Sequence, residues 1–459
     1  MKEIIFNAII FNRGRRFRGY LLTRDGKITA VRAGDPSAVE LADFDKSERT
    51  DLGGHWLLPG VIDSHVHFRD PGLTHKADIA SESRAAVAGG VTSFFDMPNT
   101  KPPTVTRRAL EDKYAHAERC SKANYAFFIG AAADNIEELR SVDYSRVPGI
   151  KLFLGSSTGN MCVSDPEALD EIFRLPALIA VHCEDEQTIL ANAAKVKQLY
   201  PQGEVPVAWH PVIRSELACY LSTRSAVERA RRLGTRLHVC HLTTAQELEL
   251  FRGQGADRRI TCEACVAHLR FTDSDYPRLG SYIKCNPAVK SDASRDALRR
   301  ALLTGDIDTV STDHAPHTLE EKEGDAFTAP SGMPMVQFSL RAMLQLTLEL
   351  PGLTPERVVQ LMCHNQADLF GVSGRGYLEP GMWADMVEVN PDGTKTPVSN
   401  RDVVSKCGWT PMQGAVLQHE IRRTWVNGVL SFDAANPDLL RSQESAAMPL
   451  RFVRGNTEA

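Results

Sequence analysis

Short apolar runs alternate with helix-like segments through the middle of the chain, and this alternation constrains the fold more than any other feature. The runs are Gly60–Phe68, Val91–Met97, Asn124–Ala131, Gly149–Leu154, Ala177–Cys183, Arg236–Leu242, Arg259–Ala264 and Ile307–Thr312. The helix-like segments between them include Lys76–Ala88, Pro166–Phe173, Ser215–Arg232 and Asp292–Leu303. Eight strands alternating with helices over about 250 residues predict an α/β fold with a parallel sheet. A (β/α)8 barrel and a doubly wound sheet both satisfy this count.

Both ends of the chain carry short strand-like segments instead. Near the N-terminus, Ile4–Phe11 is apolar, and two further short runs flank Asp25-Gly26, which is a strong hairpin signal. A helix is expected from Thr354 to about Phe370, because Pro355 suits the first helical position and Gly371 follows. Beyond it the expected strands are Ala384–Val389, Ala415–Leu417 and Thr424–Leu430.

These patterns predict three parts. Residues 1–58 and 372–459 are expected to form the two halves of a small β-sandwich-like domain, with a barrel over residues 59–371 inserted between them. The tail after about Leu440 lacks a periodic signal, so we expect a strap or a disordered segment there.

Composition narrows the class of protein. The 459 residues carry 53 basic and 58 acidic side chains, a net charge of −5, so nothing indicates a nucleic-acid or anionic-membrane partner. Ten cysteines over this length form no dense disulfide framework, and the lone pair Cys262 and Cys265 is expected to be structural. The first residues are too polar for a signal peptide, and no apolar run could span a bilayer. We therefore expect a cytoplasmic globular protein.

The sharpest polar motif follows the first apolar run, in Asp63-Ser64-His65-Val66-His67-Phe68-Arg69-Asp70-Pro71-Gly72. On a strand, residues i and i+2 share one face, so His65 and His67 would point the same way. They lie at the C-terminal end of the expected strand, where (β/α)8 enzymes place their chemistry. Two converging imidazoles suit a metal, although an isolated His-x-His is equally compatible with two core or turn histidines.

Similar residues recur at the ends of other runs. His182 ends the fifth run, His241 ends the sixth, and Asp313 and His317 follow the eighth. Lys151 lies within the fourth run, where a cation is unusual unless it is paired or modified. Each could be a satisfied core residue, but their arrival at the same end of five strands favours one shared site.

The motifs resemble those of the amidohydrolase superfamily, and most closely those of its dihydroorotase family. The resemblance covers the chain from about residue 50 to 430 and implies a TIM-type (β/α)8 barrel beside a small β domain. The residues that carry it are His65–Gly72, Asp96-Met97-Pro98-Asn99-Thr100, Lys151, His182, His241, Cys285-Asn286-Pro287, Asp313–His317 and Pro330-Ser331-Gly332-Met333-Pro334.

The resemblance implies two zinc ions per chain. The implied ligands are His65, His67 and Asp313 for the more buried zinc, His182 and His241 for the second, and N-carboxylated Lys151 as the bridge. A lysine amine must be neutral to react with carbon dioxide, and nearby cations lower its pKa. Two metals that share a water lower the pKa of that water enough to yield hydroxide at neutral pH.

The implied reaction is the reversible hydrolysis of dihydroorotate to N-carbamoyl-L-aspartate in pyrimidine biosynthesis. A metal-bridging hydroxide would attack the ring amide, and Asp313 would carry the proton to the departing nitrogen. The implied substrate-binding residues are Arg69, Asn99 and His317 at the carboxylate, and Asn286 with the backbone near Pro330–Gly332 at the ring.

Two alternatives stay open. Another cyclic amidohydrolase, such as an allantoinase, a hydantoinase or a dihydropyrimidinase, would share the metals but not the carboxylate site. A metal-free scaffold is disfavoured because all six ligand positions are filled. We expect a small-molecule substrate, no nucleic acid or membrane partner, and a homo-oligomer, either a dimer or a tetramer.

The other histidines and one charged segment have no matched role. Glu320-Glu321-Lys322-Glu323 is expected to be a solvated loop face near the site mouth. The histidines expected to be structural or solvent-facing are His55, His75, His116, His210, His238, His268, His314, His364 and His419.

Overall fold

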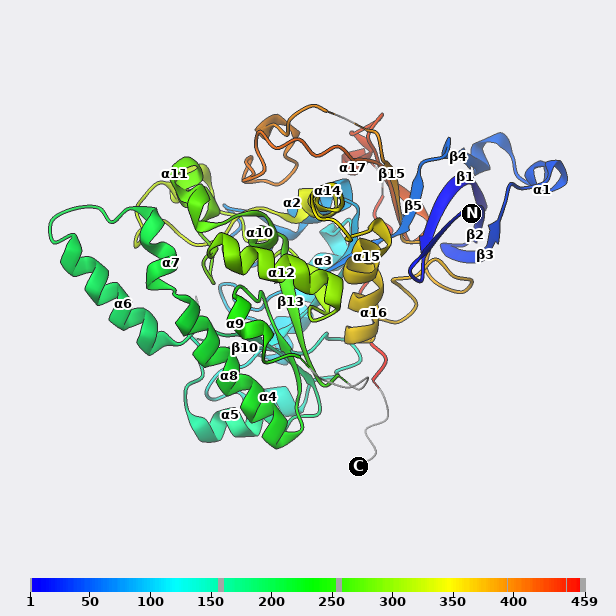
Figure 1. Ribbon diagram of the computed structural model, residues 1–459. Coiled ribbons are helices and arrows are strands. Elements are labelled where there is room, and N and C mark those ends of the chain that lie inside the picture. Colours follow the sequence, from blue (N-terminus) through cyan, green and yellow to red (C-terminus); the bar gives the residue numbers. More distant parts are fainter. Residues whose placement is uncertain (1, 156–160, 253–257, 394, 443, 455–459) are drawn as a thin grey trace.

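Every one of the eight apolar runs coincides with a barrel strand to within a few residues. The structure, a computed structural model, describes residues 2–155, 161–252, 258–393, 395–442 and 444–454 (Figure 1). The barrel strands are β6 (Val61–Val66), β7 (Val91–Asp96), β8 (Asn124–Phe127) continued by β9 (Ile129–Gly130), β10 (Ile150–Phe153), β11 (Leu178–His182), β12 (Arg236–Val239), β13 (Ile260–Cys265) and β14 (Thr309–Ser311).

These strands close into a cylinder. The order β6-β7-β8 continues through β9-β10-β11-β12-β13-β14, and all the pairings are parallel. A parallel bridge between Val66 and His314 joins the last strand to the first. The expected TIM-type barrel is confirmed, and the doubly wound alternative is wrong, because an open sheet would leave these two strands unjoined.

Helices cover the outside of the barrel and begin where the sequence places capping residues. Ser215 caps α8 by accepting from the Ala218 N–H, and the helix ends at Gly234, whose φ of 71° is left-handed. The barrel helices are α2 (Ile79–Ala88), α3 (Arg107–Cys120), α4 (Ile136–Arg140), α5 (Pro166–Phe173), α6 (Glu186–Leu199), α7 (His210–Ile213), α8 (Glu216–Leu233), α9 (Ala245–Leu248), α10 (Val266–Arg270), α11 (Tyr276–Leu279), α12 (Asp292–Thr304), α13 (Leu319–Lys322), α14 (Ser339–Glu349), α15 (Pro355–Val359) and α16 (Asn365–Phe370). A π-helical turn, Gln360–His364, joins the last two into the helix expected to end before Gly371.

Strands from both ends of the chain form a second sheet beside the barrel. Its order is β17-β16-β15-β5-β1-β2-β3, and β4 also pairs with β1. In Figure 1 the blue strands of the N-terminal part stand at the side of the molecule away from α6. The elements of this region are β1 (Lys2–Asn12), β2 (Arg15–Arg24), β3 (Lys27–Ala33), α1 (Ala38–Ala42), β4 (Arg49–Asp51), β5 (Trp56–Pro59), β15 (Met386–Asn390), β16 (Glu420–Val426), β17 (Val429–Asp433) and α17 (Leu439–Ser442).

Two expected strands of this region are placed differently. Thr424–Leu430 spans the turn between β16 and β17, where Asn427 and Gly428 both have positive φ, as a tight hairpin requires. Ala415–Leu417 is no strand, since Val416 makes only an isolated bridge to Pro397. Asn427-Gly428 is a hairpin signal that divides Thr424–Leu430 into two strands. Ala415–Leu417 is apolar but too short for its composition to separate a strand from irregular backbone.

The described part of the tail, residues 444–454, is a strap along the barrel. Leu450 N–H donates to Tyr125 O, and Phe452 N–H donates to Ser145 O. The Leu450 and Phe452 side chains are buried with Phe95 and Phe128 of the barrel. The tail therefore extends the hydrophobic core of the barrel.

Candidate metal centre and active site

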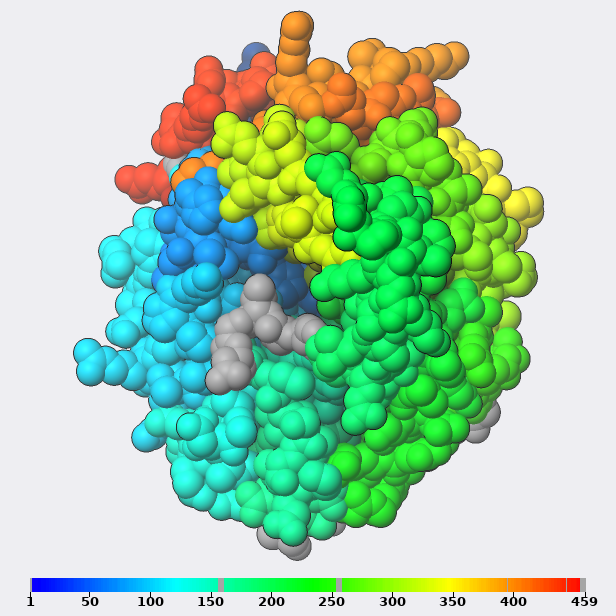
Figure 2. All heavy atoms as spheres, turned by 90° about the vertical axis from the view of Figure 1, so that its left-hand side faces the viewer, coloured from blue at the N-terminus to red at the C-terminus, as the bar shows by residue number. Residues whose placement is uncertain are grey.

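All ten residues that the sequence singles out line one cavity of about 180 Å³. Apart from Lys151, the second residue of β10, they come from the carboxyl-terminal ends of the strands or from the loops that follow, where barrel enzymes place their sites. Figure 2 shows a central hollow on this face, bordered by segments coloured from blue to yellow. The lining residues are His65, His67, Arg69, Asn99, Lys151, His182, His241, Asn286, Asp313 and His317.

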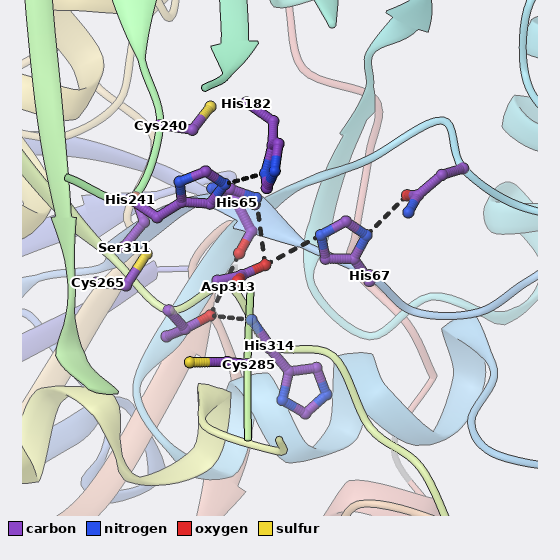
Figure 3. A network of polar contacts seen from close by, with 12 residues as sticks. His65, His67, His182, Cys240, His241, Cys265, Cys285, Ser311, Asp313 and His314 are labelled. Carbon is purple, nitrogen blue, oxygen red and sulfur yellow. Dashed lines mark hydrogen bonds and ion pairs between the residues drawn. The ribbon is translucent and has the colours of Figure 1, made fainter. Parts of the chain in front are cut away.

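Two of these residues, His65 and His67, face one carboxylate oxygen of a third, Asp313. The Nε2 atoms of His65 and His67 lie 3.3 and 3.0 Å from Oδ1 of Asp313 (Figure 3). The two rings lie side by side, with centroids 5.4 Å apart, because their residues are two apart at the end of β6. Two nitrogens and a carboxylate oxygen at this spacing form a donor set that suits a divalent ion.

The outer nitrogens of these two rings are fixed by acceptors. Glu263 accepts a hydrogen bond from Nδ1 of His65, and the amide Oδ1 of Asn99 lies 2.8 Å from Nδ1 of His67. When a ring carries its proton on Nδ1 and is neutral, the lone pair of Nε2 points toward Asp313. Two such lone pairs beside a carboxylate oxygen are ligands for a cation, so these residues fit a bound metal ion.

A second pair of histidine rings, His182 and His241, lies beside the group of His65, His67 and Asp313. Nδ1 of His182 is 2.9 Å from Nε2 of His241, and Nε2 of His182 is 3.0 Å from the buried carboxylate of Glu184. Glu184 also accepts from Arg214, which keeps it ionised and lowers its pKa to about 2 despite burial. Nδ1 of His241 is buried without a hydrogen-bond partner among the described residues.

Lys151 lies at the floor of the cavity, fully buried in β10. Its Nζ lies 3.1 Å from Sγ of Cys240, and within the described ranges no carboxylate pairs with it. A buried ammonium group without a counter-ion is costly, so this position suits a neutral or modified amine.

The backbone is strained at three of these positions. Arg69, His241 and Asp313 have φ values of 66°, 38° and 49°, in the left-handed region that residues other than glycine rarely adopt. Such strain persists only where the surroundings impose it, and it clusters at functional sites. Here it turns three polar side chains into the same cavity.

The charges in and around the group of His65, His67 and Asp313 shift the pKa values of its members. Burial lowers the pKa of His65, but the carboxylates of Glu263 and Asp313 outweigh it and raise that pKa to about 10. Burial raises the pKa of Asp313, but His65 and His67 outweigh it and lower that pKa to about 2. The anionic field that attracts a proton to His65 would equally attract a metal cation.

The opposite wall of the cavity is cationic. Arg69 is 7% exposed, and its hydrogen bonds within the described residues go to Pro316 O at 3.0 Å and to His317 Nε2 at 3.1 Å. Lys76 Nζ lies 3.0 Å from Nδ1 of the same His317. Burial, then Arg69 and Lys76, lower the pKa of His317, so its ring stays neutral. Glu321 Oε1 lies 3.0 Å from Lys76 Nζ and neutralises that charge, whereas Arg69 forms no ion pair within the described residues. The wall therefore keeps one unneutralised positive charge, which suits an anionic ligand.

Asn286 and the backbone of Pro330–Gly332 complete the lining. The Asn286 Oδ1 atom lies 3.1 Å from Nε2 of His210, so this histidine supports the cavity wall. Lys322 is buried and donates to the carbonyls of Lys284, Pro330 and Gly332. The expected solvated face at Glu320–Glu323 is therefore wrong at Lys322, because the loop wraps around its ammonium group.

Sequence reasoning missed the carboxylates behind the ligands. Glu263, in β13, holds His65 and also accepts from the backbone N–H of His241 at 3.2 Å. Glu184 holds His182. For Glu263 the signal was the one already used for Lys151, namely a charged residue within an apolar strand. Glu184 lies in the loop after β11, where no such signal applies.

Comparison with known proteins sets this geometry in a family. A model of the amidohydrolase family matches residues 56–430. The chain belongs to the amidohydrolase family. A dihydroorotase of Halobacterium salinarum is 37% identical to this amidohydrolase over 363 residues, which cover 78% of this chain and 82% of that protein. An allantoinase of Streptomyces avermitilis is 34% identical over 410 residues, covering 88% and 89%.

The fold of this amidohydrolase also has solved relatives. The L-hydantoinase (dihydropyrimidinase) from Arthrobacter aurescens superposes with a TM-score of 0.88 at 28% identity, covering 94% of this chain and 96% of that chain. Among the described residues, the helices of this amidohydrolase lack the combined length and apolar character needed to cross a membrane.

Proposed function

We propose that this amidohydrolase is a dihydroorotase, which interconverts dihydroorotate and N-carbamoyl-L-aspartate by opening and closing the ring amide. The observation that carries the proposal is the buried guanidinium of Arg69, which no carboxylate neutralises within the described chain, a few residues from the donor set of His65 and His67. Dihydroorotate combines a cyclic amide with a carboxylate, so it matches both walls of the cavity.

Arg69 and His317 are proposed to receive the substrate carboxylate. A guanidinium group offers paired donors that match the two oxygens of a carboxylate. Nε2 of His317 lies 3.1 Å from both Arg69 Nη2 and the Ser331 carbonyl, and its Nδ1 lies 3.0 Å from Lys76 Nζ. A neutral ring has one N–H, so it accepts from either Arg69 or Lys76 and not from both. Asn99 is proposed to complete this wall, while its Oδ1 also orients His67.

Two zinc ions are proposed for the opposite wall. His65, His67 and Asp313 would hold one ion, His182 and His241 would hold the other, and Lys151, carboxylated on its amine, would join them. Such ions lower the pKa of water and polarise an amide carbonyl.

Asp313 is proposed to move the proton. Its lowered pKa keeps the carboxylate ionised at neutral pH, so it can accept a proton from the attacking water. The same low proton affinity makes protonated Asp313 a good donor to the departing ring nitrogen. Asn286 and the backbone of Pro330–Gly332 line the space between the two walls and are proposed to contact the ring.

Allantoinase is the second candidate, because the Streptomyces avermitilis relative covers more of this chain than the Halobacterium salinarum one. Allantoin has the cyclic amide but no carboxylate. Its binding would leave Arg69 unneutralised beneath the ligand, which is unfavourable for a buried charge.

The test is a comparison of substrates on one preparation. The purified protein, supplied with zinc and bicarbonate, is assayed with dihydroorotate, N-carbamoyl-L-aspartate, allantoin, hydantoin and dihydrouracil. We expect the highest kcat/KM in the two directions of the dihydroorotate reaction. A higher kcat/KM with allantoin, or no turnover of dihydroorotate, would overturn the proposal. Much less than one zinc per chain would instead favour a non-catalytic scaffold.

A further inference from the structure

One buried carboxylate outside the cavity connects three distant parts of the chain. Glu82, in the first turn of α2, has no exposed surface. Its Oε1 accepts from Ser81 Oγ at 2.8 Å and from the Lys406 N–H at 3.0 Å. Its Oε2 accepts from His314 Nε2 at 2.8 Å and from Ser405 Oγ at 2.5 Å. Both oxygens are fully used, so a buried charge is tolerated here.

The contact with His314 has a defined direction. Nδ1 of His314 lies 3.0 Å from the N–H of Met335 and 3.1 Å from that of Val336, so Nδ1 must be the acceptor. The ring proton is then on Nε2, which donates to Glu82. The imidazole is thereby locked between α2 and the loop before α14.

Asp313 lies between two residues that are each fixed by a buried carboxylate. Before it, Thr312 Oγ1 donates to Asp63 at 2.6 Å. After it, His314 donates to Glu82, and the His314 carbonyl accepts from the His67 N–H at 2.7 Å. The left-handed φ of 49° at Asp313 needs such support, because it is unfavourable for a residue with a side chain.

The C-terminal part of the chain reaches the same motif twice. Residues 395–419, between β15 and β16, supply Ser405 and Lys406 to Glu82. The same segment supplies Trp409, whose buried indole Nε1–H donates to His317 O at 2.7 Å. This segment therefore contacts the stretch Asp313–His317 directly at His317, and it reaches His314 through Glu82.

We propose that Glu82 is a positioning residue for the reaction. Through His314, and secured by Ser405, it holds Asp313 in the strained conformation that directs its carboxylate between His65 and His67. The inference rests on the proposed function for the role of Asp313 as ligand and proton carrier. It adds a contribution from α2 and from the C-terminal segment to the chemistry at the barrel mouth.

The test replaces Glu82 by glutamine. Glu82→Gln keeps the size of the side chain but replaces one carboxylate oxygen, an acceptor, with an NH₂ group, a donor. If the NH₂ group replaces Oε2, it faces the donors of His314 and Ser405. If it replaces Oε1, it faces those of Ser81 and Lys406. We expect kcat for dihydroorotate to fall about 10- to 100-fold, and zinc affinity to weaken by a similar factor. KM should change by less than about threefold, since Glu82 does not touch the carboxylate wall.

The matched control is Glu388→Gln in the small sheet. Glu388 is 2% exposed and, like Glu82, accepts from a histidine, His55 Nδ1 at 2.7 Å, but it lies away from the cavity. We expect its kcat and zinc affinity to stay within about twofold of the unmodified protein, whatever stability it loses. Ser405→Ala removes one donor only and serves if Glu82→Gln does not fold. We expect about a threefold loss of kcat from it.

The inference fails if Glu82→Gln folds and keeps kcat and zinc affinity within twofold, or if Glu388→Gln loses as much of both. Zinc affinity, measured by competition with a chromogenic chelator, needs no substrate. If the unmodified protein does not turn over dihydroorotate, the proposed function fails, while the zinc measurement still decides whether Glu82 positions Asp313.

Discussion

Nε2 of His67 lies 3.0 Å from Oδ1 of Asp313, although one residue follows the first strand of the barrel and the other follows the last. Closure of the cylinder at Val66 and His314 is what brings them together. The metal-binding geometry is therefore a direct product of barrel closure. Any change that opens this seam should weaken the donor set before it unfolds the protein.

Replacement of Arg69 by methionine tests the carboxylate wall. Arg69→Met removes a buried cation while keeping an apolar stem, and we expect kcat/KM for dihydroorotate to fall by about 10²- to 10³-fold. The control is the carboxamide analogue of dihydroorotate, on which the variant and the unmodified protein should differ little. An unchanged kcat/KM on dihydroorotate would contradict the proposal and favour an allantoinase or a hydantoinase.

Loss of the Glu263 carboxylate should weaken metal binding. Glu263→Gln no longer fixes the proton of His65 on Nδ1, and we expect zinc affinity to fall about 10- to 100-fold. Glu247→Gln is the control, because Glu247 is also buried in the barrel but binds Thr223 and Thr244 instead of a site histidine. Equal zinc affinity in the two variants, measured by chelator competition, would show that Glu263 does not orient a ligand.

His268 should make the fold acid-sensitive. Burial lowers its pKa to about 4 and outweighs the hydrogen bond from Nε2 to Pro287 O, which raises that pKa. Nδ1, which would take the second proton, has no partner among the described residues. A histidine with a lowered folded pKa binds fewer protons than the unfolded chain, so its stabilisation is lost as the pH falls below 6.5 toward 4. Between pH 7 and 5 this one group should cost about 2 kcal/mol of unfolding free energy.

Urea denaturation at these two pH values measures that cost. His268→Gln keeps a donor for Pro287 but cannot be protonated, so its stability should fall less between pH 7 and 5. Other buried histidines contribute to both proteins and cancel in the comparison. Parallel pH dependences for the two proteins would refute the assignment.

The tail strap should stabilise the barrel through its two buried side chains. Leu450 is 1% exposed, and Leu450→Ala should lower the unfolding free energy by about 2 to 5 kcal/mol. Val453, three residues on, is 66% exposed, and Val453→Ala should change stability by less than about 0.5 kcal/mol. Urea denaturation of both variants compares them directly, and similar losses would mean that the strap does not pack as described.

The sequence predicted the barrel because its strands are local patterns with a fixed direction. Each apolar run gives one strand, or in Asn124–Ala131 the two consecutive strands β8 and β9, and parallel strands bring their carboxyl ends to one rim. His65, Lys151 and Asp313 could therefore be expected in one cavity without any knowledge of the contacts between them. The structure brings together the full predicted set of lining residues.

The supporting contacts could not be predicted in the same way. Glu82 and Ser405 are hydrogen-bonded although they are 323 residues apart in the sequence, and nothing near either residue indicates the other. Lys322 looked solvated within an acidic run, but it is buried by the carbonyls of a loop whose path the sequence does not specify. Such partners depend on three-dimensional packing, which local periodicity does not report.

The sheet built from both chain ends has a consequence for biogenesis. β5 pairs with β15, so the strand pairing at Leu58 can form only after Val387 has been synthesised. During translation the ribosome makes the entire barrel in that interval, and the early strands present an unpaired edge meanwhile. Pairings this distant in sequence form slowly. Nascent-chain solubility should therefore depend on how quickly the later strands arrive.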